Sequence, residues 1–153
     1  DYGCDYEMYV SDISRTWPVN GKFSEKHRKA YQDVLDVQKE VIKAVRPGQT
    51  LIGLDFLTRK LLKEKGYAKN IRHGVSHYLG MLVHDVGGFG KPFEPGVIVT
   101  IEPGIYFKEE GWGIRIEDDI LVTEDGHRNL TKDVPKEIDE IEALASTWKH
   151  RKK

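Results

Sequence analysis

Five side chains of this sequence could together bind metal ions. They are four carboxylates and one imidazole, each close to a glycine, a proline or a strand-like stretch: Asp1, Asp12, His77, Glu102 and Glu117. Four carboxylates held close together repel one another unless cations lie between them. Because carboxylate oxygens are hard ligands, the set suits two divalent ions, with Mn²⁺ as the first candidate and Co²⁺, Fe²⁺ or Zn²⁺ as rivals. Such a site is typical of a two-metal hydrolase.

The first two carboxylates come together if the chain begins with a hairpin. A turn at Tyr6-Glu7 places Asp1 directly opposite Asp12. Opposed side chains share one face of the strand pair, with Cβ atoms about 5 Å apart. Two bare carboxylates at that separation destabilise a hairpin, so a cation between them explains the pattern. The competing interpretation is that both are ordinary surface acids.

The other two carboxylates repeat this geometry later in the chain. A turn centred on Glu109-Glu110 sets Glu102 opposite Glu117. Pro103-Gly104 interrupts the first strand, and a bulge there would alter this register. Two hairpins that each present a facing pair of acids favour the metal interpretation more strongly than one.

Three histidines, His73, His77 and His84, lie within twelve residues of one another. Their spacing would align them on one helical face, but the glycines around them argue against a helix. Histidines beside glycine turns favour a site. The chain has no H-E-x-x-H arrangement and no Gly-x-Ser-x-Gly elbow, and Cys4 has no obvious basic partner, so zincin and nucleophilic chemistry are disfavoured.

Composition limits the remaining classes of protein. The 153 residues fit one domain, and 24 basic against 25 acidic residues give a net charge of −1, so nucleic acid is a poor candidate partner. The basic run 149–153 is expected to be a solvated tail. No apolar run approaches the roughly 20 residues that cross a bilayer. A single cysteine favours a reducing compartment, and we expect a cytoplasmic protein, with an upstream leader left open.

The pattern of residues predicts strands, then two helices, then strands, which is an α+β order. Expected elements are strands within residues 1–19, a helix from the N-cap Ser24 to Arg46, a helix capped by Thr50 and closed by Gly66, an irregular segment 72–96, strands Val97–Ile101, Ile105–Phe107 and Ile114–Val122, a turn at Asp125-Gly126, and a helix from Pro135 to Leu144.

The candidate residues lie in stretches that resemble a known family. The matching motifs are Asp1-Tyr-Gly-Cys4, Val10-Ser-Asp-Ile-Ser-Arg-Thr-Trp-Pro-Val-Asn-Gly21, His73-Gly-Val-Ser-His-Tyr-Leu-Gly80, Val83-His-Asp-Val-Gly87, Thr100-Ile-Glu-Pro-Gly-Ile-Tyr106 and Gly113-Ile-Arg-Ile-Glu-Asp-Asp119. Together they resemble the pita-bread metallopeptidases, and within them aminopeptidase P, with prolidase as a close relative. The resemblance covers residues 1 to about 144. It implies a partial pita-bread fold, a curved antiparallel sheet with helices on its outer face.

The resemblance also implies a role for each matching residue. The ligands of two metal ions are matched by Asp1, Asp12, His77, Glu102 and Glu117, with Asp12 and Glu117 bridging. His73 and His84 match histidines on the substrate side, whereas Asp1, Tyr106 and Arg115 match a hydrogen-bonded relay behind the metals. Glu102 is the candidate for moving a proton. The implied catalytic residues are thus His73, His84, Glu102, Tyr106 and Arg115. One departure is Met8, where many relatives have glycine.

The implied activity is removal of the N-terminal residue from peptides that have proline in second position. Two alternatives stay open: a prolidase confined to Xaa-Pro dipeptides, and a non-catalytic peptide-binding fragment of the same fold. A full catalytic domain of this family is longer, so residues 1–153 are expected to be its C-terminal part. Alone, this part is expected to bind metal weakly and to hydrolyse Xaa-Pro peptides slowly or not at all. The expected partners are the peptide substrate and, for the full-length protein, further copies in a homo-oligomer.

Overall fold

The computed structural model describes residues 1–149 and has the predicted α+β composition. The helices in this range are α1 (Glu25–Lys43), α2 (Leu51–Glu64), α3 (Ile138–Lys149) and the 3-10 helix η1 (Lys108–Glu110). The strands form three small antiparallel sheets: β1 (Asp5–Tyr6) with β2 (Tyr9–Val10); β3 (Ile98–Ile101), β6 (Asp118–Val122) and β7 (His127–Asn129); and β4 (Gly104–Phe107) with β5 (Trp112–Arg115). Beyond Lys149, the basic run expected as a solvated tail lies outside the described residues.

The two long helices begin where the sequence predicts because their N-terminal amides find side-chain acceptors. The Ser24 hydroxyl accepts from the His27 amide, and the Thr50 hydroxyl accepts from the Gly53 amide. Helix α1 ends at Lys43, a little before the expected Arg46. No helix among residues 1–149 is long and apolar enough to cross a bilayer.

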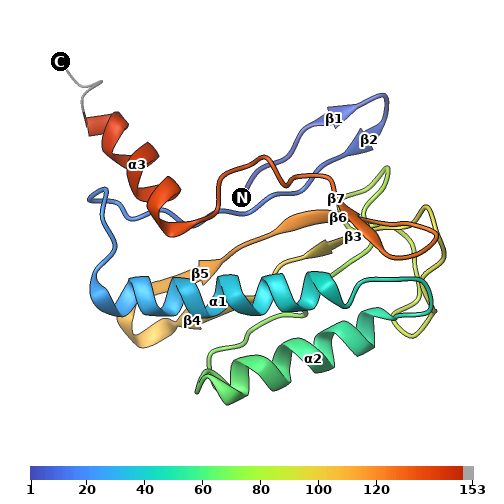
Figure 1. The fold of residues 1–153 in the computed structure, drawn as a ribbon, viewed down its shortest axis with the longest axis horizontal. Coiled ribbons are helices and arrows are strands. Elements are labelled where there is room, and N and C mark those ends of the chain that lie inside the picture. Colours follow the sequence, from blue (N-terminus) through green and yellow to red (C-terminus); the bar gives the residue numbers. More distant parts are fainter. Residues whose placement is uncertain (150–153) are drawn as a thin grey trace.

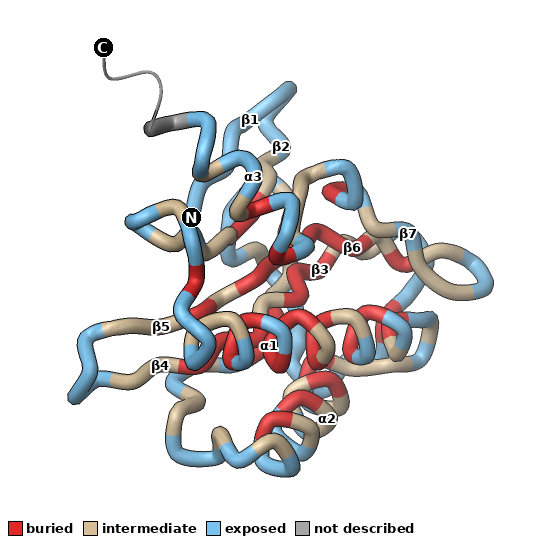
Figure 2. The backbone as a smooth tube through the Cα atoms, turned by 60° about the vertical axis from the view of Figure 1, so that its left-hand side comes forward, coloured by how far each residue is buried: buried red, intermediate tan, exposed pale blue. Residues whose placement is uncertain are grey.

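Helix α1 covers one side of the strands, and α2 packs along α1 (Figure 1). Buried residues follow the inner side of α1 and the central strands (Figure 2). The core cluster includes Leu35 and Val41 of α1, Leu54 of α2, and Ile101 and Ile114 of the strands. Each such side chain stabilises the fold by about 1.5–3 kcal/mol on burial. This core supports the strand ends from which the acids project.

The first hairpin exists, but its predicted register is wrong. Tyr6 pairs with Tyr9, and Tyr2 forms a bridge to Ile13, so the turn is at Glu7-Met8. Both turn residues have positive φ, 49° for Glu7 and 73° for Met8, as a two-residue hairpin turn requires. The true turn is therefore one residue later than predicted.

This register changes how the first two acids are placed. It puts Asp12 opposite Gly3 and leaves Asp1 level with Ser14. Because side chains alternate between faces, Asp1 and Asp12 still share a face as diagonal neighbours. They are not the directly opposed pair that the sequence suggested.

The second hairpin has the predicted register. Ile101 pairs with Asp118 in one sheet, and Gly104 pairs with Arg115 in the next. The register is therefore the same on both sides of Pro103. No extra residue is inserted, and the anticipated bulge is absent from this hairpin. Glu102 therefore falls opposite Glu117. The strand predicted over Ile114–Val122 is divided between β5 and β6.

Two other elements differ from the prediction, and the irregular segment agrees with it. Helix α3 begins at Ile138, not at Pro135, and continues past Leu144 to Lys149. Strand β7 was missed because its three residues, His127–Asn129, are polar; it follows the predicted turn at Asp125-Gly126. Segment 72–96 has no helix or multi-residue strand, as the glycines indicated.

Candidate metal centre

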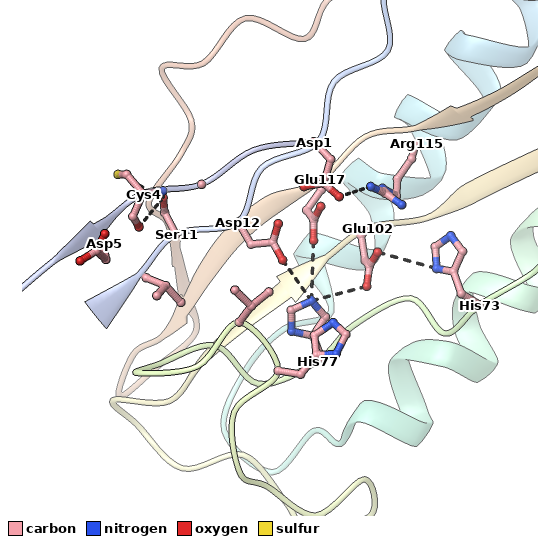
Figure 3. A pocket seen from close by; sticks show the side chains of 14 residues that line it. Asp1, Cys4, Asp5, Ser11, Asp12, His73, His77, Glu102, Arg115 and Glu117 are labelled. Atoms are coloured by element: carbon pink, nitrogen blue, oxygen red, sulfur yellow. Dashed lines mark hydrogen bonds and ion pairs between the residues drawn. The ribbon is translucent and has the colours of Figure 1, made fainter. Parts of the chain in front are cut away.

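Segments distant in the sequence meet around a cleft of about 680 Å³ (Figure 3). The hairpin β1–β2 and its continuation provide one wall, and the irregular segment provides the opposite wall. Glu102, Arg115 and Glu117 come from the ends of the central strands. Among the predicted site residues, Tyr106 alone is not part of this lining.

Three carboxylates converge on one imidazole nitrogen. From Nε2 of His77, the nearest carboxylate oxygens of Asp12, Glu102 and Glu117 lie at 3.4, 3.7 and 3.9 Å. Ligand atoms of Asp12, His77 and Glu117 all lie within 4.8 Å of one another. This spacing leaves room for a cation between the groups.

Hydrogen bonding fixes the state of His77. Its Nδ1 lies 3.1 Å from the carbonyl oxygen of Tyr78, and a carbonyl can only accept, so Nδ1 carries the proton. Burial lowers the pKa of His77, which favours the neutral ring. The Nε2 lone pair therefore faces the carboxylates, which is the arrangement of a metal-binding histidine held by its other nitrogen.

The carboxylates are costly to ionise without a cation. Burial, followed by the charges of Glu117 and Asp12, raises the pKa of Glu102 to about 8. Burial is also the largest cause that raises the pKa of Glu117 to about 7. Oε1 of Glu117 is buried and has no hydrogen-bond partner within the described chain. An acceptor oxygen left unpaired beside other acids and an imidazole lone pair fits a divalent metal ion.

Asp1 occupies the rim of the cleft rather than the tight cluster. Its exposed carboxylate forms an ion pair with Nη2 of Arg115, as Figure 3 shows. Nε of Arg115 donates to the Ser14 hydroxyl at 2.7 Å, and that hydroxyl donates to Oε2 of Glu117 at 2.6 Å. Asp1 is therefore connected to Glu117 through two side chains.

His73 and Tyr106 form a second contact pair beside the cluster. Nδ1 of His73 donates to the Gly74 carbonyl, so Nε2 accepts the Tyr106 hydroxyl at 2.9 Å. A side chain at Gly104 would place its Cβ 2.8 Å from this Nε2 and 2.9 Å from the tyrosine oxygen. Nδ1 of His73 also lies 3.7 Å from Glu102. The glycine thus leaves the space in which the histidine and the tyrosine meet.

His84 reaches the cleft on a loop that folds back on itself. Its ring lies 4.3 Å from the ring of His77, centroid to centroid. The Asp85 carboxylate accepts from the amides of Met81 and Val86, at 2.8 and 2.7 Å. A Cβ on Gly80 would lie 2.0 Å from that carboxylate. These contacts hold the loop and bring His84 next to His77, although no helix aligns them.

Two buried residues beside the cluster were not identified from the sequence. Ser14 contacts both Arg115 and Glu117, and Oδ2 of Asp119 accepts from the Asp12 amide at 3.2 Å. Burial raises the pKa of Asp119 to about 7. Each lies two positions after a predicted ligand, Asp12 or Glu117, so the two-residue period of an extended chain could have indicated both.

Carboxylates and an imidazole that converge at the strand ends of an antiparallel α+β fold define a metallohydrolase class of protein. The chain belongs to metallopeptidase family M24, whose model matches residues 1–124. Divalent metal ions and peptide substrates are therefore the general expectation for it.

The similar proteins carry related names. The chain is 41% identical to Xaa-Pro aminopeptidase of Haemophilus influenzae, over 94% of the chain and 40% of that protein. Human Xaa-Pro aminopeptidase 3 is 40% identical, over 95% of the chain and 34% of that protein. The structure of zinc-substituted Escherichia coli aminopeptidase P in complex with product superposes with a TM-score of 0.83 and 37% identity, over 94% of this chain and 40% of that one.

These comparisons confirm the predicted pita-bread fold. The chain spans about 40% of the length of the bacterial relatives it matches.

Proposed function

We propose that this chain carries the two-metal centre of an Xaa-Pro aminopeptidase, with Mn²⁺ as the resident ion. The observation that carries the proposal is the convergence of Asp12, Glu102 and Glu117 on the unprotonated Nε2 of His77. The names of the relatives supply the substrate class. Five residues would hold the ions: Asp1, Asp12, His77, Glu102 and Glu117.

The ions, when bound, supply Lewis acidity that polarises the scissile carbonyl and activates a water molecule. Two divalent ions would carry as many positive charges as the four carboxylates carry negative ones, which is why the acids could lie close together. Asp1 has to turn part of its carboxylate away from Arg115 to join the ligands, and its exposure leaves it free to do so.

Glu102 is the proposed carrier of the proton. It lies between His77 and His73, at 3.7 Å from a nitrogen of each, so its carboxylate faces the cleft from the position between the two rings. A carboxylate that exchanges a proton readily suits transfer to the departing proline nitrogen. Proline also lacks the amide hydrogen on which ordinary peptidases depend.

His73 and His84 are the proposed groups that hold the substrate. Nδ1 of His73 is fixed by the Gly74 carbonyl and its Nε2 by the Tyr106 hydroxyl, so the ring has one orientation. His84 lies against His77 on the same wall of the cleft. His84 can donate a hydrogen bond to the carbonyl of a peptide as charge develops on it, whereas His73 has to release its bond to Gly74 or to Tyr106 before it can do so.

The charge distribution of the cleft favours an aminopeptidase over a prolidase. Of the described residues that line it, Arg115 is the one permanent cation. Its Nη2 is paired with Asp1 and its Nε with Ser14, so a dipeptide carboxylate would have to compete for it. A longer peptide has no such carboxylate next to its second residue.

The test compares three peptides with added Mn²⁺: Arg-Pro-Pro, Arg-Ala-Ala and the dipeptide Arg-Pro. Release of free arginine from Arg-Pro-Pro, with little from the other two, is the expected result. Hydrolysis of Arg-Pro alone would identify a prolidase. Binding of Arg-Pro-Pro without hydrolysis of any peptide would favour a non-catalytic binding protein.

The location and assembly of the protein are separate proposals. A cytoplasmic location is supported by the lone cysteine. One relative, from Arabidopsis thaliana, is named a mitochondrial peptidase, so fractionation of cells has to decide between the compartments. For the full-length protein we propose a homo-oligomer, which sedimentation of that protein tests.

A further inference from the structure

We propose that Ser14 is a positioning residue of the metal centre, which transmits the orientation of Arg115 to Glu117. The inference rests on the proposed metal centre and assigns a function to a residue outside the proposed ligand set. Ser14 is 3% exposed and lies between the guanidinium and the carboxylate. It touches neither the cleft nor the reacting atoms.

The directions of the hydrogen bonds follow from the chemistry of the groups. A guanidinium nitrogen can only donate, so the Ser14 oxygen accepts from Nε of Arg115, at 2.7 Å. The hydroxyl has a single proton, and Oε2 of Glu117 lies 2.6 Å away to receive it. Because Arg115 can only donate, it cannot take the Ser14 proton, and that proton is free to bind Glu117.

This bond determines which oxygen of Glu117 remains free. Oε2 is engaged by Ser14, whereas Oε1 is buried, unpaired and directed to His77 at 3.9 Å. Partial rotation of the carboxylate would break its bond to a buried hydroxyl and turn the free oxygen away from His77. Ser14 therefore holds Glu117 in the orientation that presents an oxygen to a cation.

The surrounding backbone holds the serine in place. The Glu117 amide donates to the Ser14 carbonyl at 3.1 Å, so the two residues are joined by main chain as well as side chain. The Thr16 hydroxyl accepts from the Arg115 amide and donates to its carbonyl, at 3.1 and 3.0 Å. Segment 14–16 is thus hydrogen-bonded to the main chain of Arg115 and of Glu117, the two residues that the Ser14 hydroxyl contacts.

The alternative is that Ser14 only fills space beneath the cleft. Ser76 provides a matched control because it is also buried, adjoins the ligand His77, and its hydroxyl has no hydrogen-bond partner within residues 1–149. Ser14→Ala and Ser76→Ala remove the same atom from two buried sites, which are 3% and 9% exposed. Only the first removes a hydrogen bond to a proposed ligand.

The experiment is titration of Mn²⁺ into metal-free protein by calorimetry, with thermal unfolding of the metal-free variants alongside. Loss of a hydrogen bond to a metal ligand typically weakens metal affinity about 10–100-fold. We expect Ser14→Ala to raise the Kd for Mn²⁺ by about that factor, and Ser14→Thr, which keeps the hydroxyl, to recover most of it. Ser76→Ala should leave the Kd for Mn²⁺ within about twofold of the value for the unsubstituted chain.

The outcomes separate this inference from the proposed function. Ser14→Ala with an unchanged Kd, or a Kd shifted no more than in Ser76→Ala, overturns the positioning role while the metal centre stands. If Ser14→Ala does not fold, Ser14→Cys is measured instead, since a thiol has nearly the same volume but is a weak donor; an unchanged Kd there overturns the inference equally. A parent chain that binds no Mn²⁺ contradicts the metal centre and the inference with it.

Discussion

Glu102 and Glu117 lie opposite each other on antiparallel segments, and both direct an oxygen to Nε2 of the same histidine. Their strands keep register across Pro103, so the pair is set by the hairpin and not by flexible side chains. Two buried acids in that arrangement repel one another unless they are protonated or neutralised by a cation. The following predictions test this relationship and the framework around it.

Glu117→Gln keeps the shape of a proposed bridging ligand but removes its charge. We expect the variant to lose one or both divalent ions, measured by metal analysis after Mn²⁺ loading, and to lose peptidase activity with them. Glu109→Gln, on the exposed turn of the same hairpin, is the control and should retain both. Full metal content in Glu117→Gln would mean that this residue is not a ligand.

The metal-free chain should become less stable as pH rises. The folded-state pKa of Glu102 is about 8 and that of Glu117 about 7, both above the ordinary value of 4.5. A raised pKa means that the folded protein binds more protons than the unfolded chain between these values. The stabilisation is complete below pH 4.5 and is lost as pH rises to about 8.

Thermal unfolding in chelator checks this prediction. Between pH 5 and pH 8 we expect Tm to fall by at least about 5 °C, because 1 kcal/mol corresponds to about 2–4 °C in a domain of this size. Saturating Mn²⁺ should remove most of the decrease, since the ions favour the ionised acids. A metal-free Tm that is flat or rises over this range contradicts the burial of the acids.

Asp118 should be essential for stability rather than for metal binding. Its fully buried carboxylate pairs with Arg15 at 2.7 Å and with Lys136. Burial acts to raise its pKa, but the two cations outweigh burial and lower it. Asp118→Ala removes the carboxylate that neutralises both cations, and breaking a buried pair costs about 3–5 kcal/mol.

Urea unfolding measures the effect of Asp118→Ala. The matched control is Asp139→Ala, which removes an exposed partner of Arg28 and should cost far less, because solvent screens that pair. Equal losses in the two variants would show that the Asp118 pair contributes no more than a surface ion pair.

Local signals in the sequence were sufficient for the main elements. Ser24 and Thr50 begin the long helices because side-chain caps act within one turn of the chain. The second hairpin followed from its strand pattern, and the glycines of segment 72–96 correctly excluded a helix. The first turn was misplaced by one residue because Glu7 and Met8 adopt positive φ, which neither residue type favours.

Contacts between distant segments were beyond such signals. Arg15 donates to the carbonyls of Glu117, Val134 and Pro135 as well as to Asp118, and nothing near Arg15 in the sequence indicates these partners. Likewise, the bond from Ser14 to Glu117 depends on how the first hairpin packs against β5 and β6. The candidate ligands could be proposed from the sequence and its resemblance to a family. The residues that hold those ligands in place, such as Ser14, could be identified only from the structure.

We propose that the carboxylates around His77 hold two divalent ions. The most direct measurement is the stoichiometry of Mn²⁺ binding to the chain, purified without chelators and saturated with Mn²⁺, by equilibrium dialysis with metal analysis. We expect about two ions per chain and a sharp decrease in Glu117→Gln. A stoichiometry near zero for the folded parent chain would contradict it.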